Sequence, residues 1–166
     1  VGANWTDVWN SLLDGSLRKP GRWGKTLGSA VPMAMVAVGT IISTKVGLIN
    51  IGQEGQMLVG AAFAAYVGAH APGSGPIVIC LVIIGGFVGG AFWSGLAGAL
   101  RYWRNVPEVL TTLLLVTVAA NLVGYALKNT WLLLDPDAAF GNRALVSKQL
   151  DPDSRLPRVE IFGNNF

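Results

Sequence analysis

Long apolar stretches separated by short polar segments dominate this chain. Four stretches are each long enough for a helix that crosses a bilayer, which needs about 20 mostly apolar residues. They cover residues 26–44, 50–71, 77–100 and 109–127. The turn-forming sequence Pro-Gly-Ser-Gly-Pro separates the second stretch from the third, and a polar junction, Arg-Tyr-Trp-Arg-Asn, separates the third from the fourth. The pattern predicts an all-α, polytopic helical membrane protein, with about four transmembrane helices in a core of residues 26–127.

A separate amphipathic segment precedes the first apolar stretch. Within residues 4–17, apolar side chains recur at the spacing of a helix, opposite a polar face. The apolar positions are Trp5, Val8, Trp9, Leu12, Leu13 and Leu17, and the polar ones are Asn4, Asp7, Asn10, Ser11 and Asp14. The segment is too short and too polar to span a bilayer. Residues 1–25 are therefore predicted to hold a helix that either lies at the membrane interface or packs on the protein itself, and that is ended by Gly15 and then Pro20-Gly21.

The chain becomes polar again after the last apolar stretch. Asp135-Pro136 and Asp151-Pro152 are typical of turns. Residues 128–166 are expected to form an extramembrane loop, with a short strand at 158–162. Because the chain begins with valine and stops within a polar stretch, we expect it to be a fragment cut at both ends.

The charge distribution agrees with a membrane protein and argues against several soluble classes. Charged residues make up 13% of the chain, about half of the roughly 25% that is typical of a soluble domain. Only five lie within residues 26–127: Lys45, Glu54, Arg101, Arg104 and Glu108. A soluble globule, a disordered chain, a coiled coil and a nucleic-acid-binding domain all fit this pattern poorly. The net charge of +3 does not indicate a nucleic-acid partner, because the cations are scattered between apolar stretches.

The sequence holds no set of residues that predicts catalysis. His70 is the only histidine and Cys80 the only cysteine, so neither a nucleophile–histidine set nor a cysteine-based metal site can be assembled. A phosphate-binding GxxxxGK[ST] motif is also missing from the sequence. We therefore expect a non-enzymatic protein, with no metal or cofactor bound by this chain.

Glycine is frequent inside the third apolar stretch. Gly85 and Gly89, and likewise Gly86 and Gly90, form pairs of small residues four positions apart, which let helix backbones approach closely in lipid. This helix is predicted to pack against protein on at least one face. The pairs fit general close packing, and a motif specific to dimers is the alternative.

A polar segment at residues 47–57 lies between two apolar stretches. It places Asn50, Gln53, Glu54 and Gln56 beside glycines that loosen the backbone. A carboxylate at the bilayer centre costs roughly 2.5–3.5 kcal/mol, so such groups need a reason to be there. One interpretation is capping, with Asn50 as N-cap, Gln53 at the third helical position and Glu54 in the first turn. The other is a role in lining or gating a pathway for a polar substrate, and the two do not exclude each other.

A second polar segment, residues 104–115, begins the fourth apolar stretch. Pro107 at the first helical position and Glu108 beside it are ordinary helix-start chemistry. Thr111 and Thr112 can bond back to the carbonyl four residues earlier or across to another helix. Asn121 lies deeper and needs a partner, because an unsatisfied amide in hydrocarbon costs several kcal/mol.

Together these segments resemble the permease subunits of ATP-binding-cassette importers for nucleosides and simple sugars, which are related to the ribose and branched-chain amino acid permeases. That family shows a "GLxNIGxEGQ" block, two spans and then an "NEVxxTLxLN" block. This chain reads GLINIGQEGQ from Gly47 and PEVLTTLLLV from Pro107. The sequence TLGSAVP from Thr26 is similar to the family's "TLxxAxP" segment. The chain departs from the pattern at Pro107 and Val116, where the family has asparagine, and these departures leave the substrate subclass open.

The resemblance implies partners and an orientation. Such permeases have roughly eight to ten spans and lie in the bacterial inner membrane. They pair with a second permease subunit as a homo- or heterodimer, bind two ATPase subunits and receive solute from an extracytoplasmic binding protein. Residues 1–25 and 128–166 would then be extracytoplasmic. A positive-inside count of Lys and Arg, with nine at the ends and three at Lys45, Arg101 and Arg104, points to the opposite orientation.

The main functional hypothesis is a permease subunit that moves a nucleoside or simple sugar inward by alternating access. Its expected pathway-lining or gate-supporting residues are Asn50, Glu54, Gln56, Glu108 and Thr112. One alternative is an ion-coupled secondary transporter or channel that needs no ATPase partner. Another is a membrane-embedded structural or assembly protein without a solute path.

Overall fold

The computed structural model describes most of the chain and divides it into two units. The described residues are 2, 4–19, 22–73, 75–136, 147–150, 152–155, 160–161 and 164–165. One unit comprises Val1–Ile41 with Pro157–Phe166, and the other comprises Ile42–Leu156. Apart from one two-residue strand pair, the regular elements are helical, as predicted.

The first unit begins with the amphipathic helix α1 (Trp5–Leu13). Helix α1 continues without interruption into η1 (Asp14–Arg18), a turn of π-helix, so Gly15 does not end it, whereas the second predicted end signal, Pro20-Gly21, follows directly after its C-cap Lys19. Side-chain bonds explain the extension: the Ser16 hydroxyl donates to the Leu12 carbonyl at 2.8 Å, and the Arg18 guanidinium donates to the Asn10 side-chain oxygen at 3.1 Å. Helix α2 (Arg22–Lys45) follows and runs through Pro32.

A short strand pair closes the sequence of elements. Strand β1 (Glu160–Ile161) pairs antiparallel with β2 (Asn164–Asn165), with Glu160 opposite Asn165. The predicted strand at 158–162 overlaps β1, while residues 158, 159 and 162 lie outside the described residues.

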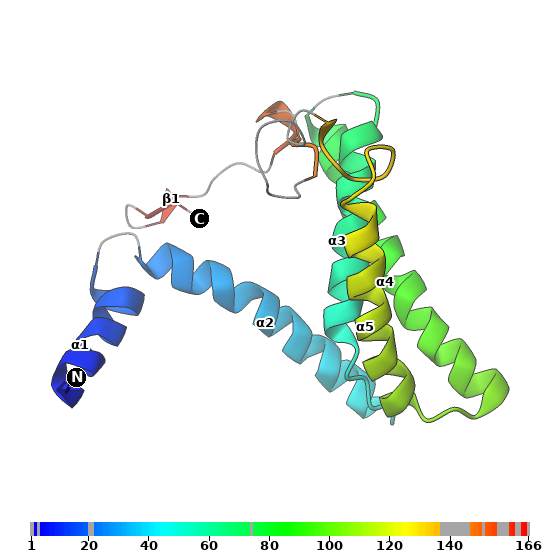
Figure 1. Cartoon of the computed structure of the whole chain (residues 1–166), viewed down its shortest axis with the longest axis horizontal. Helices are drawn as coiled ribbons and strands as arrows, with labels where there is room; N and C mark the ends of the chain where they lie inside the picture. The colour runs from blue at the N-terminus through cyan, green and yellow to red at the C-terminus, as the bar shows by residue number, and fades with distance from the viewer. Residues whose placement is uncertain are drawn as a thin grey trace. The chain divides into compact units, whose positions relative to one another are not determined.

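The second unit is a bundle of three helices (Figure 1). These are α3 (Gln53–His70), α4 (Pro76–Arg104) and α5 (Glu108–Ala126). Among the described residues, α2, α4 and α5 are long and apolar enough to cross a membrane. Helix α3 is not among them; its first turn carries Gln53, Glu54 and Gln56 and its last residue is His70.

Small residues let α3 and α4 approach closely. A Cβ atom added to Gly60 would lie 2.9 Å from the Gly86 carbonyl oxygen, and one added to Gly89 would lie 2.7 Å from the Phe63 Cβ. A Cβ on Gly85 would likewise meet the Val67 side chain at 2.9 Å. The prediction that the glycine-rich helix packs against protein is therefore confirmed, and α3 supplies the surface.

The core of this unit is small and lies where the three helices meet. Val59, Trp93 and Ala119 form its buried cluster, and Leu58, Leu96 and Leu115 pack around it. Trp93 is only 6% exposed, and its Nε1 has no hydrogen-bond partner among the described residues. Large apolar side chains cover most of the outer surface of the helices, as expected for segments that face lipid or other protein.

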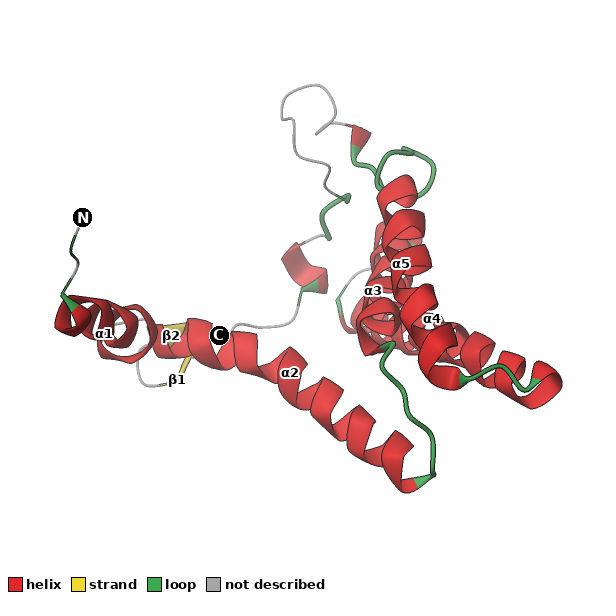
Figure 2. Ribbon diagram, turned by 60° about the horizontal axis from the view of Figure 1, so that its bottom comes forward, coloured by secondary structure: helices red, strands yellow, loops and turns green. Residues whose placement is uncertain are grey.

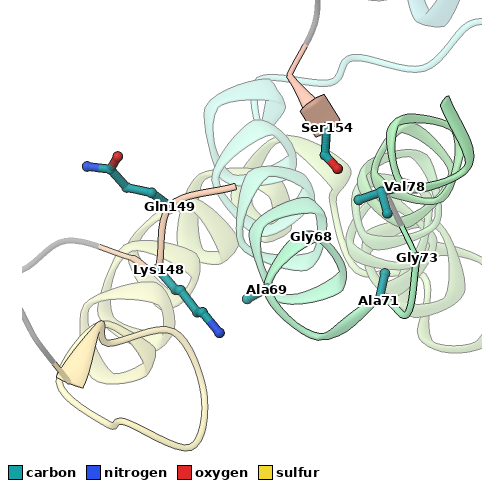
Figure 3. Close-up of a pocket in the computed structure, with 8 residues that line it drawn as sticks. All are labelled: Gly68, Ala69, Ala71, Gly73, Val78, Lys148, Gln149 and Ser154. Carbon is teal, nitrogen blue, oxygen red and sulfur yellow. The ribbon is translucent and has the colours of Figure 1, made fainter. Parts of the chain in front are cut away.

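The chain after α5 folds back over the turn between α3 and α4. Leu134 forms a β-bridge with Ser147, and the Lys148 N–H donates to the Leu133 carbonyl at 3.3 Å. In η2 (Pro152–Ser154), the buried Ser154 hydroxyl accepts a bond from the Gly75 N–H at 3.1 Å. Figure 3 shows this returning segment beside the end of α3, around a small cavity of about 90 Å³. The expected loop at 128–166 is thus partly ordered against the bundle, whereas residues 137–146 lie outside the described residues.

Candidate functional site

The two polar segments that stand out in the sequence meet at one end of the second unit. The backbone N–H of Ile49 donates to Glu108 Oε1 at 3.1 Å, and that of Ile51 donates to Thr112 Oγ1 at 3.4 Å. Glu108 and Thr112 are four residues apart, so they lie on one face of α5. The segment between α2 and α3 therefore runs along the first turns of α5.

Glycines make this close approach possible. A Cβ on Gly52 would lie 2.9 Å from the Thr112 Cβ, and one on Gly55 would lie 3.0 Å from the Val116 Cα. The contacts thus advance along residues 108, 112 and 116 of α5 as the chain advances from 49 to 55. Gly52 and Gly55 have only a hydrogen atom in place of a side chain, and a larger residue at either position would push the start of α3 away from α5.

The turn that ends α2 directs the chain towards α5. Gly47 has φ of +81°, a left-handed conformation that glycine adopts without steric cost. The Gly47 and Leu48 N–H groups donate to the carbonyls of Thr44 and Ser43, at 3.0 and 2.9 Å, which closes the helix end. The residues that follow are then free to extend along the neighbouring helix.

Glu108 also connects the end of α4 to the site. Its carboxylate forms an ion pair with the Arg101 guanidinium, and the Glu108 side chain is 15% exposed whereas that of Arg101 is 46% exposed. Asn105, with φ of +52°, provides the left-handed C-cap that turns the chain from α4 towards α5. One carboxylate therefore joins three segments: the end of α4, the start of α5 and the segment before α3.

Side-chain amides stabilise the same segment from within. The Asn50 side-chain oxygen accepts a bond from the Gly52 N–H at 2.9 Å, and its amide group donates to Gln56 Oε1 at 3.3 Å. Gln53 Nε2 donates to the Asn50 carbonyl at 2.7 Å. These bonds form a local turn immediately before α3.

Two helix-start predictions need correction. Asn50 is not the N-cap of α3, because the helix begins at Gln53 with Gly52 as its N-cap, and the Asn50 side chain bonds two residues ahead instead. Pro107 is the N-cap of α5 rather than its first helical residue, which is Glu108. In the first case the chain runs along α5 before α3 begins, and in the second Pro107, with ψ of 125°, does not yet have a helical conformation.

Glu54 differs from the other four candidate residues. It lies in the first turn of α3, is exposed, and makes no hydrogen bond or ion pair within the part of the chain that the structure describes. Its carboxylate benefits from the positive end of the helix dipole. The structure thus joins Asn50, Gln56, Glu108 and Thr112 into one bonded region and leaves Glu54 at its surface.

Sequence reasoning missed two residues of this region. Arg101 was treated only as a flanking charge, although a cation in the last turn of one helix and an anion at the start of the next are placed to pair across a short connection. Trp93 carries no local signal, because its burial beside Gly55 depends on how α3, α4 and α5 pack.

The predicted polar bonds of α5 are made locally. The Thr111 hydroxyl donates to the Pro107 carbonyl at 3.0 Å, and the Thr112 hydroxyl donates to the Val109 carbonyl at 3.2 Å. The Asn121 amide donates to the Thr117 carbonyl at 2.8 Å, which supplies the partner that its depth requires. Of these three residues, Thr112 also accepts a bond from another segment, from the Ile51 N–H.

Comparison with known proteins places this arrangement in context. Residues 24–143 match the family described as branched-chain amino acid transport system, permease component. A glucose ABC transporter permease protein of Haloferax volcanii is 36% identical over 104 residues, which are 63% of this chain and 27% of the relative. A guanosine ABC transporter permease protein of Bacillus subtilis is 28% identical over 129 residues, 78% of this chain and 36% of the relative.

A third relative is also a permease protein of an ABC transporter. A nucleoside ABC transporter permease protein of Lactococcus lactis is 36% identical over 110 residues, which are 66% of this chain and 29% of the relative. The matched part of the chain therefore spans about a quarter to a third of the length of these curated relatives. No solved structure matches the chain significantly.

Proposed function

This chain belongs to the family of permease components of branched-chain amino acid transport systems, and on that basis we propose that it is part of an importer subunit that carries a nucleoside or simple sugar across the plasma membrane. The three relatives are named as permease proteins for glucose, guanosine and nucleosides, which supports this substrate class. The apolar helices α2, α4 and α5 support a place within the bilayer.

The energy for transport would come from partner subunits. In this proposal two ATPase subunits hydrolyse ATP, a second permease subunit completes the pathway, and an extracytoplasmic binding protein delivers the solute. The role proposed for this chain within that assembly is mechanical: Glu108 and Thr112 hold backbone N–H groups of the segment before α3.

The observation that carries the proposal is the contact between the segment before α3 and the start of α5. Glu108 and Thr112 hold this segment through the backbone N–H groups of Ile49 and Ile51. Asn50 and Gln56 stiffen it from within. In the proposed mechanism these four residues position the first turn of α3, so that a shift of α5 carries this turn with it.

Glu54 is the residue proposed to face the pathway. Its carboxylate lies on that first turn and is not used for packing among the described residues. A carboxylate can accept hydrogen bonds from the hydroxyl groups of a sugar or the ribose of a nucleoside, and a helix start that carries polar groups is a common way to address such solutes in a membrane. Transport should therefore depend on the Glu54 carboxylate more than stability does.

The test is uptake by the complete transporter in proteoliposomes that contain ATP, measured with radiolabelled guanosine and glucose. We expect Glu54→Ala to abolish uptake while membrane insertion and helical content, measured by circular dichroism, stay unchanged. Asp153→Asn is the matched control, because Asp153 is also an exposed acid but lies at the opposite end of the bundle. Normal uptake by Glu54→Ala would refute the pathway role and leave the residue a helix-start function only.

The same vesicles distinguish the energy source. An ATP-driven importer takes up no solute when ATP is replaced by a non-hydrolysable analogue. Uptake that continues without ATP and follows an imposed ion gradient would refute the importer proposal and favour an ion-coupled carrier.

A further inference from the structure

The amphipathic helix α1 has an apolar face that no described residue covers. Trp5, Val8, Trp9 and Leu12 form this face, with exposed fractions between 51% and 76%, and α1 has no buried residue. The opposite face carries polar side chains, including Asp7 and Asn10. Two tryptophans and two aliphatic side chains facing outward need an apolar environment.

The junction with α2 places this face at the level of a membrane surface. Helix α2 is long and apolar enough to cross a bilayer, and only three residues separate its start at Arg22 from the end of η1. The Thr26 hydroxyl donates to the Ser16 carbonyl at 2.8 Å, which ties η1 to the beginning of α2. In Figure 1, α1 and α2 meet at an angle rather than forming one straight helix. An amphipathic helix in this position can lie along the surface that α2 crosses.

A basic cluster lies at the same junction. Arg18, Lys19, Arg22 and Lys25 fall within eight residues; Arg22 is partly buried and the other three are exposed. The half-exposed indole of Trp23 lies among them, a residue type that is enriched at the level of lipid headgroups. Arg18 approaches Asp14 only at 3.9 Å, with both side chains well exposed, so this weak pair leaves the cluster strongly positive.

We propose that α1 lies in the headgroup region with its apolar face towards the acyl chains, and that the basic cluster binds the phosphates of anionic lipids. The charge of the cluster selects this occupant: a purely apolar protein partner would cover the apolar face of α1 but would supply no anion for the basic cluster, in which only Arg18 has a weak acidic partner of its own among the described residues. Cations near an anionic membrane surface each gain attraction that falls off within a Debye length. This inference does not depend on the transported solute or on the energy source.

The experiment measures how deeply each face of α1 enters the membrane. Cys80→Ser gives a cysteine-free background, because Cys80 is the only cysteine. Nitroxide labels are placed at Val8→Cys on the apolar face and at Asn10→Cys on the polar face, and the whole chain is reconstituted in lipid nanodiscs. Collisions with oxygen, which concentrates in hydrocarbon, are compared with collisions with a water-soluble nickel chelate.

We expect the ratio of oxygen to nickel collisions to be several-fold higher at position 8 than at position 10. The ratio at position 8 should rise further when phosphatidylcholine is replaced by an equal mixture with phosphatidylglycerol. The triple variant Lys19→Gln/Arg22→Gln/Lys25→Gln should lose this rise and keep the helix, because Arg18 and its bond to Asn10 remain. Lys45→Gln, a basic residue at the other end of α2, is the matched control and should keep the rise.

Three results would overturn the proposal. Equal nickel accessibility at both positions would place α1 in water. A label at position 8 that neither reagent reaches would place the apolar face on protein. A ratio that is the same in both lipid mixtures would show that the basic cluster does not select anionic lipid.

Discussion

Glu108 joins three segments of the second unit: the end of α4, the start of α5 and the segment before α3. One carboxylate oxygen accepts the Ile49 N–H and the other pairs with Arg101, while the backbone of Glu108 begins α5. A group that is mostly buried and bonded on both sides stabilises a local structure that removal of either partner disrupts. The arrangement of the α2–α3 segment should therefore depend on this residue.

Two substitutions of Glu108 should distinguish the contribution of its hydrogen bond to the Ile49 N–H from that of its ion pair with Arg101. Glu108→Gln keeps an oxygen for the Ile49 N–H but loses the charge, so we expect a loss of about 0.5–1 kcal/mol in the free energy of unfolding, because the Arg101 side of the pair is half exposed. Glu108→Ala also leaves the N–H without its acceptor and should lose about 1–3 kcal/mol. Unfolding of the chain in detergent micelles, followed by circular dichroism, measures both changes.

The Arg101→Gln background provides the control for this pair. There, Glu108→Gln should have almost no further effect, whereas Glu108→Ala should still destabilise the chain because the bond to Ile49 is independent of the charge. If Glu108→Gln costs as much with Arg101→Gln as without it, the two residues are not coupled and the ion pair does not stabilise the fold.

At the scale of single residues, the sequence identifies the residues of the candidate site but not the groups to which they bond. Glu54, Glu108, Asn50 and Gln56 stand out because polar groups between apolar stretches are rare and costly. The bonds of Glu108 and Thr112 go to backbone N–H groups about 60 residues away, and every residue except proline carries such a group. Only the packing of the segment against α5 determines which N–H each side chain meets.

At the scale of elements, the contact between α3 and α4 depends on the absence of side chains. Gly60 lies against the backbone of Gly86, and a backbone atom cannot move aside as a flexible side chain can. Overpacking of a close contact typically costs about 1–3 kcal/mol. The short distance between α3 and α4 is therefore possible only because Gly60 has no side chain.

Gly60→Ala should force α3 away from α4. We expect a loss of about 1–3 kcal/mol in the free energy of unfolding in micelles, because the new Cβ would lie 2.9 Å from the Gly86 carbonyl oxygen. Gly98→Ala is the matched control in α4, since nothing lies within 4 Å of its added Cβ, and it should keep or slightly raise stability. Equal stability of the two variants would contradict the close contact between α3 and α4.

Sequence patterns locate the helices better than their ends and connections. Proline, glycine and polar junctions mark where apolar stretches stop, so α4 and α5 begin within a residue of the predicted positions. Of the two end signals predicted for the first helix, Gly15 does not act, because side-chain bonds of Ser16 and Arg18 continue the helix, and Pro20-Gly21 follows its actual end. The return of the chain to Gly75 through Ser154 has no sequence signal, since a serine hydroxyl can bond almost any nearby N–H.

At the scale of the whole molecule, two features of the chain bear on which end of the bundle faces the cytoplasm. The contacts between Ile49, Arg101 and Glu108 place the connections after α2 and after α4 at one end of the second unit. The bond between Gly75 and Ser154 places the turn after α3 and the returning segment together (Figure 2). The family resemblance implies that the first end faces the cytoplasm, whereas a count along the sequence finds nine of the twelve Lys and Arg residues in segments 1–25 and 128–166, which the resemblance makes extracytoplasmic.

We expect the family orientation to hold, because the positive-inside rule applies to short loops near the ends of spans and is weak for long polar segments. Of these nine cations, four lie in the long polar segment after residue 140, where the rule is weak, and the four of the basic cluster lie at the start of α2, where the rule counts them. In the Cys80→Ser background, Tyr102→Cys and Asp153→Cys introduce exposed thiols at the two ends of the bundle. A membrane-impermeant maleimide should label Tyr102→Cys only in inside-out vesicles and Asp153→Cys only in right-side-out vesicles. The reverse pattern would mean that the charge count determines the orientation, and it would move Glu54 and the segment that Glu108 holds to the side where solute enters.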